Sequence, residues 1–314
     1  MAKAKKEKKP FKVRFKQFQE ESKAEIKRSK ASFVVFLILA VSVVGMLIWS
    51  LITRNYENSG SCILVLILFS VPSFIERHLN IDIPIPFEII ILVFIYAAQI
   101  LGEMNSFYIK FPWWDTMLHT INGFLFAAVG FALCDIINQN ANIKFKLSPL
   151  FLSVVAFCFS MTIGVLWEFF EFGMDKLFLF DMQKDTVVTQ FASVYFDTTN
   201  SNIMVKVVNI GKTIIYDTDG NVLQTISGGY LDIGITDTIE DLFVNLIGAI
   251  VFSIFGFLYV KSRGQNKLAS HFIPTLKTEE EIKSIDNAIT NNNSQTLEAT
   301  KKEETVSNQE KKNN

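Results

Sequence analysis

The sequence predicts an all-α integral membrane protein, a six-span helical bundle with a small extracytoplasmic β-rich insert between the fifth and sixth spans. Half of the 314 residues are hydrophobic. They fall in blocks of about 17–25 residues, the length that a helix needs to cross a hydrocarbon core about 30 Å thick. The charges lie between and around these blocks, in a basic arm at the start and a polar tail at the end. This segregation excludes a soluble globular fold.

Six blocks are long and apolar enough to be spans. They cover residues 32–53, 61–77, 85–102, 115–136, 149–172 and 238–260. Pro84 and Pro86 open the third span, and proline is tolerated in a first helical turn because its missing N–H costs no hydrogen bond there. Trp113 and Trp114 precede the fourth span, and indole rings favour the membrane interface. We expect the first span to remain as an anchor, because it lacks a cleavage site.

Charge predicts three regions and an orientation. Residues 1–31 form a basic cytosolic arm, residues 32–262 the membrane domain and residues 263–314 a disordered cytosolic tail. The arm holds twelve Lys or Arg residues, either as a solvated run or as an amphipathic helix on anionic lipid. By the positive-inside rule both termini lie in the cytosol, because the short loops predicted to be outside carry only Arg54 and Lys110.

Residues 176–236 form the extracytoplasmic insert. Three of its stretches are rich in β-branched residues, and Asp217–Asn221 is a turn signal between the last two. We therefore predict a small antiparallel meander over the outer ends of the helices. It is either a lid on a site or a tolerated loop insertion, and the sequence does not choose between these.

Three spans carry ionisable side chains at helical spacing near their outer ends. Asp115 and His119 are four residues apart in the fourth span, and Glu168 and Glu171 are three apart in the fifth. The sixth span adds Asp237, Asp241 and Asn245 at positions i, i+4 and i+8. Residues at these spacings share one helix face. Because ionisable groups inside spans cost a few kcal/mol each, we expect them to face the protein interior and to form one polar site.

This set of side chains fits several kinds of chemistry. The candidate catalytic residues are Asp115, His119, Glu168, Glu171, Asp237, Asp241 and Asn245, and the candidate metal ligands are His119, Glu168 and Asp241. An imidazole with carboxylates is a reasonable set of ligands for a divalent ion that activates water. Without a metal, His119 and a protonated Glu could act as general base and acid. The same groups could bind a cation or proton in transport, or serve only to pack the helices.

The motifs resemble a bacterial family of inner-membrane proteins typified by YjdF. The shared pattern is an acid four residues before a His, as in Asp115 and His119, a Trp-Glu-x-x-Glu helix end at residues 167–171, and Asp-Thr-x-x-Asp at residues 237–241. Residues 241–248 are also similar to the Asp-x-x-x-Asn-x-x-Gly helix of VanZ-like proteins. The resemblance implies a bacterial cell-membrane location and a shared polar site, and it supplies no reaction.

Three functions remain open at this point. The first is an enzyme, with or without a divalent metal, that acts on lipid or cell-envelope substrates at the outer face. The second is a non-catalytic envelope or scaffold protein, and the third is an ion-coupled transporter. Membrane lipids are the partners that the composition implies, and the sequence has no nucleic-acid signature and identifies neither a substrate nor a cofactor.

Overall fold

The structure, a computed structural model, describes residues 30–79, 81–139, 146–262 and 270–278. These residues are mostly helical. Six helices are long and apolar enough to cross a membrane: Lys30–Ile52, Tyr56–Glu76, Ile85–Met104, Trp114–Asn138, Pro149–Phe178 and Ile235–Lys261. The predicted fold class is confirmed, with a small β insert between the fifth and sixth helices. The chain divides into two compact units, residues 1–105 with 266–314 and residues 106–265, and each holds three of the six helices.

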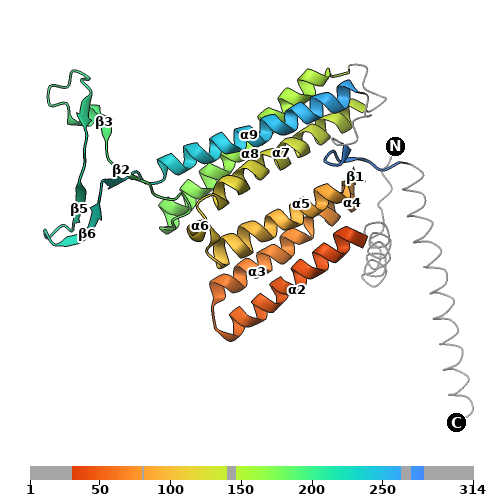
Figure 1. Cartoon of the computed structure of the whole chain (residues 1–314), viewed down its shortest axis with the longest axis horizontal. Coiled ribbons are helices and arrows are strands. Elements are labelled where there is room, and N and C mark those ends of the chain that lie inside the picture. The colour runs from red at the N-terminus through yellow and green to blue at the C-terminus, as the bar shows by residue number, and fades with distance from the viewer. Residues whose placement is uncertain (1–29, 80, 140–145, 263–269, 279–314) are drawn as a thin grey trace, which may run out of the picture. The chain divides into compact units, whose positions relative to one another are not determined.

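The first unit contains the first three candidate spans (Figure 1). Its elements are α2 (Lys30–Ile52), α3 (Tyr56–Phe69), α4 (Val71–Leu79), β1 (Ile81–Asp82), α5 (Ile85–Tyr96), the π-helix η1 (Ala97–Met104) and β8 (Thr275–Leu276). A core cluster joins α2, α3, α5 and η1 through Val43, Cys62, Val65, Phe69, Leu92 and Ile100. Strand β8 pairs antiparallel with β1, and Ile273 just before it is buried. These residues fall within the predicted tail of residues 263–314, and its disorder stays a prediction.

The second unit is built on three helices that pack against one another pairwise, α7 (Trp114–Gln139), α8 (Pro149–Phe178) and α9 (Ile235–Lys261) (Figure 1). The short helix α6 (Phe107–Lys110) precedes α7. Helix α8 begins where the sequence suggests, because the Ser148 hydroxyl accepts a hydrogen bond from the Phe151 N–H and Pro149 occupies the first turn. The buried rings of Phe131 and Phe252 form an edge-to-face pair between α7 and α9.

Two glycines bring the backbones of α7 and α9 close together. A Cβ on Gly248 of α9 would overlap the backbone carbonyl oxygen of Thr120, and a Cβ on Gly123 of α7 would overlap that of Asn245. Small residues at such positions allow helices in a membrane to approach closely. This approach brings the polar faces of the two helices within reach of each other.

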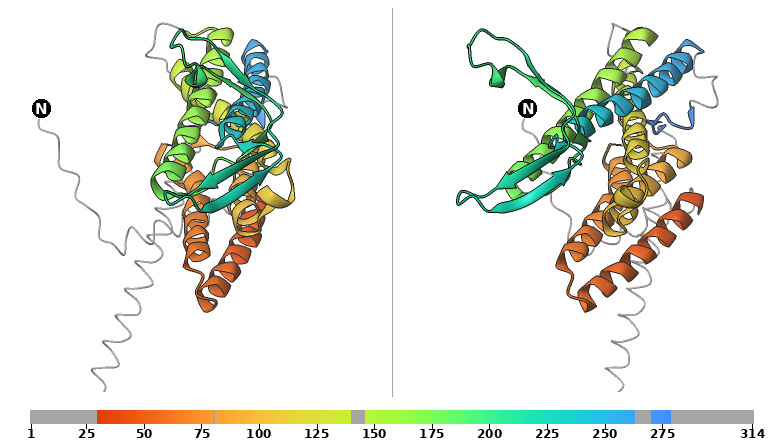
Figure 2. Two further views of the ribbon diagram at one scale, coloured as in Figure 1. Left: turned by 90° about the vertical axis from the view of Figure 1, so that its left-hand side faces the viewer. Right: turned by 60° about the vertical axis from the view of Figure 1, so that its left-hand side comes forward.

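The insert between α8 and α9 forms paired strands that extend beyond the ends of these helices (Figure 2). Its elements are β2 (Val187–Val188), β3 (Phe191–Ser193), the 3-10 helix η2 (Val194–Phe196), β4 (Val205–Val207), β5 (Lys212–Tyr216), β6 (Val222–Ser227) and β7 (Tyr230–Leu231). The predicted hairpin across Asp217–Asn221 is confirmed by the β5–β6 pair. The predicted meander is wrong, because β4 pairs back with β3 and β2 pairs with β7.

Side-chain carboxylates hold the base of the insert. Asp175 near the end of α8 accepts hydrogen bonds from the N–H groups of Met182 and Gln183 at 2.7 and 2.9 Å. Asp232 accepts from the N–H groups of Thr186 and Thr236 at 2.9 and 3.0 Å. The two chain segments that enter and leave the insert are thus fixed close to the helices.

Several sequence predictions differ from the structure in detail or lie outside the described residues. The second span begins at Tyr56 instead of 61, because the Asn55 side chain caps it by accepting from the Asn58 N–H. The fifth continues to Phe178 instead of 172. The cysteines Cys62, Cys134 and Cys158 are free thiols, and Cys158 is exposed on α8. The basic arm up to residue 29 and the tail from 279 lie outside the described residues.

Glycine at position 248 should be required for stability. We expect Gly248→Ala to destabilise the folded protein by about 1–3 kcal/mol, the usual cost of overpacking, because the new methyl group meets the Thr120 carbonyl. Denaturant unfolding in detergent measures this change. Gly173→Ala on α8 is the matched control, because a Cβ there meets nothing within 4 Å. Equal stability of the two variants would contradict the close helix approach.

The stability that Asp232 gives to the base of the insert, through the hydrogen bonds that it accepts, should depend on pH. Partial burial alone would raise the pKa of Asp232, but hydrogen bonds from the Thr236 hydroxyl and from the N–H groups of Thr186, Thr236 and Gly234 lower it below its ordinary value. The stabilisation is therefore present above the ordinary pKa of about 3.9 and is lost as the pH falls through the lower folded value. Hydrogen exchange should show the Thr186 amide protected at pH 5 and exposed by Asp232→Ala. Protection of the Thr186 amide that persists in Asp232→Ala would contradict the role of the Asp232 carboxylate in holding this segment.

Candidate functional site

The site begins on α7, where Asp115 and His119 lie one turn apart. The carboxylate Oδ1 of Asp115 is 3.6 Å from Nε2 of His119. The His119 side chain is 12% exposed and the Asp115 side chain 28%. The predicted helical face therefore exists, and its imidazole points away from bulk solvent.

Helix α9 brings a second carboxylate to the same ring nitrogen. Asp241 is only 4% exposed, and its Oδ2 lies 3.7 Å from Nε2 of His119. One ligand atom from each of Asp115, His119 and Asp241 lies within 4.8 Å of the others, a spacing that could hold a metal ion. Two helices that are far apart in the sequence thus supply three ligands of the type that a divalent ion uses.

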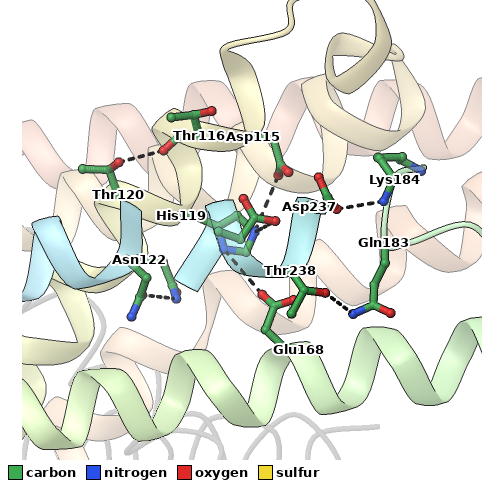
Figure 3. Close-up of polar contacts among 12 residues, drawn as sticks. Asp115, Thr116, His119, Thr120, Asn122, Glu168, Gln183, Lys184, Asp237 and Thr238 are labelled. Carbon is green, nitrogen blue, oxygen red and sulfur yellow. Dashed lines mark hydrogen bonds and ion pairs between the residues drawn. The ribbon is translucent and has the colours of Figure 1, made fainter. Parts of the chain in front are cut away.

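Helix α8 places Glu168 on the opposite edge of the imidazole. Its Oε1 lies 4.0 Å from Nδ1 of His119, so that the ring stands between carboxyl groups (Figure 3). Glu168 is 4% exposed, and its second oxygen, Oε2, is buried without a hydrogen-bond partner in the described part of the chain. Glu168 therefore faces a different ring nitrogen from Asp115 and Asp241, which makes it a neighbour of His119 outside the group of three ligand atoms.

Two further acids complete the group. Glu171 is buried one turn along α8, and its charge interacts with those of Glu168, Asp115 and Asp237. Asp237, in the first turn of α9, accepts a hydrogen bond from the Lys184 N–H at 2.8 Å (Figure 3). Five carboxyl groups and one imidazole thus share a largely buried space. Like charges at this density require protons or a bound cation to offset their repulsion.

Asn245 lies further along α9 than Asp241, where it contacts the two other helices. It is 1% exposed, its Oδ1 accepts a hydrogen bond from the Asn122 amide at 3.2 Å, and its own amide donates to the Met161 sulfur at 3.5 Å. These contacts join α7, α8 and α9 below the acids. The structure therefore places Asn245 as a link between the three helices, and not beside the His119 ring nitrogens.

Two polar residues next to this site were not among the sequence candidates: Gln183 was missed, and Thr238 was quoted only as part of the Asp-Thr-x-x-Asp motif. Gln183, from the base of the insert, is 8% exposed and donates a hydrogen bond from Nε2 to the Thr238 hydroxyl at 2.6 Å (Figure 3). Both residues interact with Glu168. Helical spacing could have indicated Thr238, which lies between Asp237 and Asp241. No spacing rule connects residue 183 to a helix that begins at 235.

The distances suit an ion held at Nε2. Two ligand atoms that each lie about 2.1 Å from a tetrahedral ion are about 3.4 Å apart. The separations of 3.6 and 3.7 Å from Nε2 to the two Asp oxygens are close to that value. The nitrogen and two carboxylates fit Zn²⁺, Mn²⁺ or Fe²⁺ better than an all-oxygen ion such as Ca²⁺.

The family of this chain follows from its sequence. A family described as "Predicted membrane protein (DUF2238)" matches residues 35–262, which include all seven candidate site residues. The chain belongs to this family. The DUF2238 match confirms the resemblance to the YjdF-like family, which is the same family, and the likeness to VanZ-like proteins stays a prediction. No curated protein and no solved structure matches the chain.

Removal of one acid should relieve the repulsion in this cluster. In the presence of a chelator, we expect Asp241→Asn to raise the melting temperature of this DUF2238 protein by a few degrees, which corresponds to about 1 kcal/mol. Added Zn²⁺ or Mn²⁺ should then stabilise the unmodified protein and not the variant. The control is Glu240→Gln, because the neighbouring Glu240 is exposed on the same helix. A lower melting temperature for Asp241→Asn in chelator would contradict net repulsion.

Proposed function

We propose that this protein is a membrane-embedded enzyme that binds one divalent ion and acts on a lipid or cell-envelope substrate at the outer face of a bacterial cell membrane. Nε2 of His119, Asp115 and Asp241 are the proposed ligands. The observation that carries the proposal is the arrangement around one ring: two carboxylates lie 3.6 and 3.7 Å from Nε2, and a third lies 4.0 Å from Nδ1.

The number of ligands favours catalysis over a purely structural metal. Structural zinc sites are closed by four protein ligands, whereas catalytic sites use three and leave a position open for water or substrate. When bound, such an ion would polarise a phosphoryl or carbonyl oxygen of the substrate and activate a water molecule. Three ligands in a partly open site, with Asp115 28% exposed, fit the second type.

The remaining acids have separate roles in this proposal. The Glu168 carboxylate, 4.0 Å from Nδ1 of His119, favours the tautomer with the proton on Nδ1 and so leaves the Nε2 lone pair for the ion. Glu171 and Asp237 lie close enough to interact with Asp115 without belonging to the ligand group. They are the groups available to accept or donate a proton during the reaction.

The charge distribution supports the outer face as the location. The site lies at the start of α7 and α9 and near the end of α8. The opposite ends of these helices adjoin the Lys144 and Lys146 loop and Lys261. The short loops predicted to be outside carry only Arg54 and Lys110, and the lysines of the insert belong to a long segment, for which loop charge has little effect on orientation. Basic loops stay in the cytosol, so the site faces outward and both termini face inward.

An ion-coupled carrier is the second candidate, because the site holds five carboxyl groups and the proposed ion uses only two of them, those of Asp115 and Asp241. Ion flux into proteoliposomes separates the two functions. Flux that is abolished by Asp241→Asn would favour the carrier. Metal bound tightly without flux would favour the enzyme.

Bound metal is the first test of the enzyme. We expect purified protein to hold about one equivalent of Zn²⁺ or Mn²⁺, and His119→Ala to lose it with at least a 100-fold weaker affinity, because a ligand contributes more than the 10–100-fold typical of an outer-shell partner. The control is His78→Ala, which removes an exposed histidine. Metal content can be measured by atomic emission beside a folding check by circular dichroism. Equal metal in the two variants, or none in the unmodified protein, would reject the proposal and favour a scaffold.

A further inference from the structure

The β insert supplies a buried amide to the site. Gln183 lies at the start of the insert, yet its side chain is buried and donates to the Thr238 hydroxyl of α9 at 2.6 Å. A buried polar side chain is costly unless its hydrogen bonds are made. Gln183 therefore occupies a buried position fixed by a hydrogen bond, unlike a loop residue at the protein surface.

The backbone around Gln183 is fixed from two sides. Its N–H donates to Asp175 Oδ2 at 2.9 Å, and the next N–H, that of Lys184, donates to Asp237 Oδ2. Gly234, with a φ of +79°, lies so close that a Cβ there would be 2.6 Å from the Gln183 Cβ. The insert thus holds this one side chain against the start of α9 with little freedom.

The contacts form a chain that leads to the imidazole. The Thr238 hydroxyl accepts from Gln183, so its own hydrogen remains free to be donated. Gln183 and Thr238 both interact with the Glu168 carboxyl, whose Oε1 is 4.0 Å from Nδ1 of His119 (Figure 3). A carboxylate on one ring nitrogen fixes the tautomer and orientation of a metal-binding histidine, and such outer partners change metal affinity by about 10–100-fold.

We propose that Gln183 and Thr238 are positioning residues that orient Glu168, and through it His119, for the binding of a divalent ion at Nε2. The inference rests on the proposed function. It makes the insert a necessary part of the site and not a tolerated loop insertion.

The unpartnered oxygen of Glu168 also supports this assignment. Oε2 is buried and has no hydrogen-bond partner among the residues that the structure describes, so the carboxyl group is not fully satisfied by protein contacts. A small closure toward the donors Thr238 and Gln183 on ion binding would satisfy it.

The test compares the affinity for Zn²⁺ alone in the full-length protein. Gln183→Leu and Thr238→Val should each weaken Zn²⁺ binding by about 10-fold or more, and Thr238→Ser, which keeps the hydroxyl, should bind within about 2-fold of the unmodified protein. The two losses should not add in the double variant, because both act on Glu168. Competition with a chromophoric chelator measures these affinities.

A matched control separates positioning from general loosening of the insert. Asp232→Ala removes the hydrogen bonds to Thr186 and Thr236 at the same base but leaves the Gln183–Thr238 pair intact. It should bind Zn²⁺ within about 2-fold of the unmodified protein. An equal loss in Asp232→Ala, or unchanged affinity in both Gln183→Leu and Thr238→Val, would overturn the inference while the proposed function stands. Absence of Zn²⁺ binding by the unmodified protein would overturn both.

Discussion

Five carboxyl groups and one imidazole lie, largely buried, between three apolar helices, and the packing of these helices has to accommodate the charge of this cluster. Water is displaced from Glu168 and Asp241, each 4% exposed, and neither reaches a basic side chain other than His119 in the contacts around the ring. Such groups cost free energy unless protons, hydrogen bonds or a cation offset their charge. A divalent ion at Nε2 would offset the charge of Asp115 and Asp241 directly, which is the physical basis of the proposed function.

The packing of the helices and the geometry of the site depend on each other. Gly123 and Gly248 let α7 and α9 approach, and the same approach brings Asp241 to the ring nitrogen that Asp115 already faces. Below the acids, Asn122 and Asn245 hydrogen-bond across the same interface. A side chain at either glycine would separate the helices and widen the space between the proposed ligands.

Most of the membrane architecture could be predicted from the sequence, because hydrophobic length and helical spacing are local properties. The six spans, the shared face of Asp115 and His119, and the β5–β6 hairpin are of this kind. The strand pairing of β2 with β7 could not be predicted, because it joins residues on opposite sides of the insert. The same limit applies to Glu168, whose placement at Nδ1 depends on the rotation of α8, and to Gln183, which reaches the site through tertiary contacts alone.

The coordination of a bound ion tests the central claim most directly. X-ray absorption spectroscopy on the purified, Zn²⁺-loaded protein reports the nearest ligands and the outer atoms of an imidazole ring. We predict a first shell of nitrogen and oxygen at about 2.0–2.1 Å that includes a single imidazole. A first shell of water and carboxylate oxygen without imidazole scattering would contradict the account, because His119 would then not be a ligand.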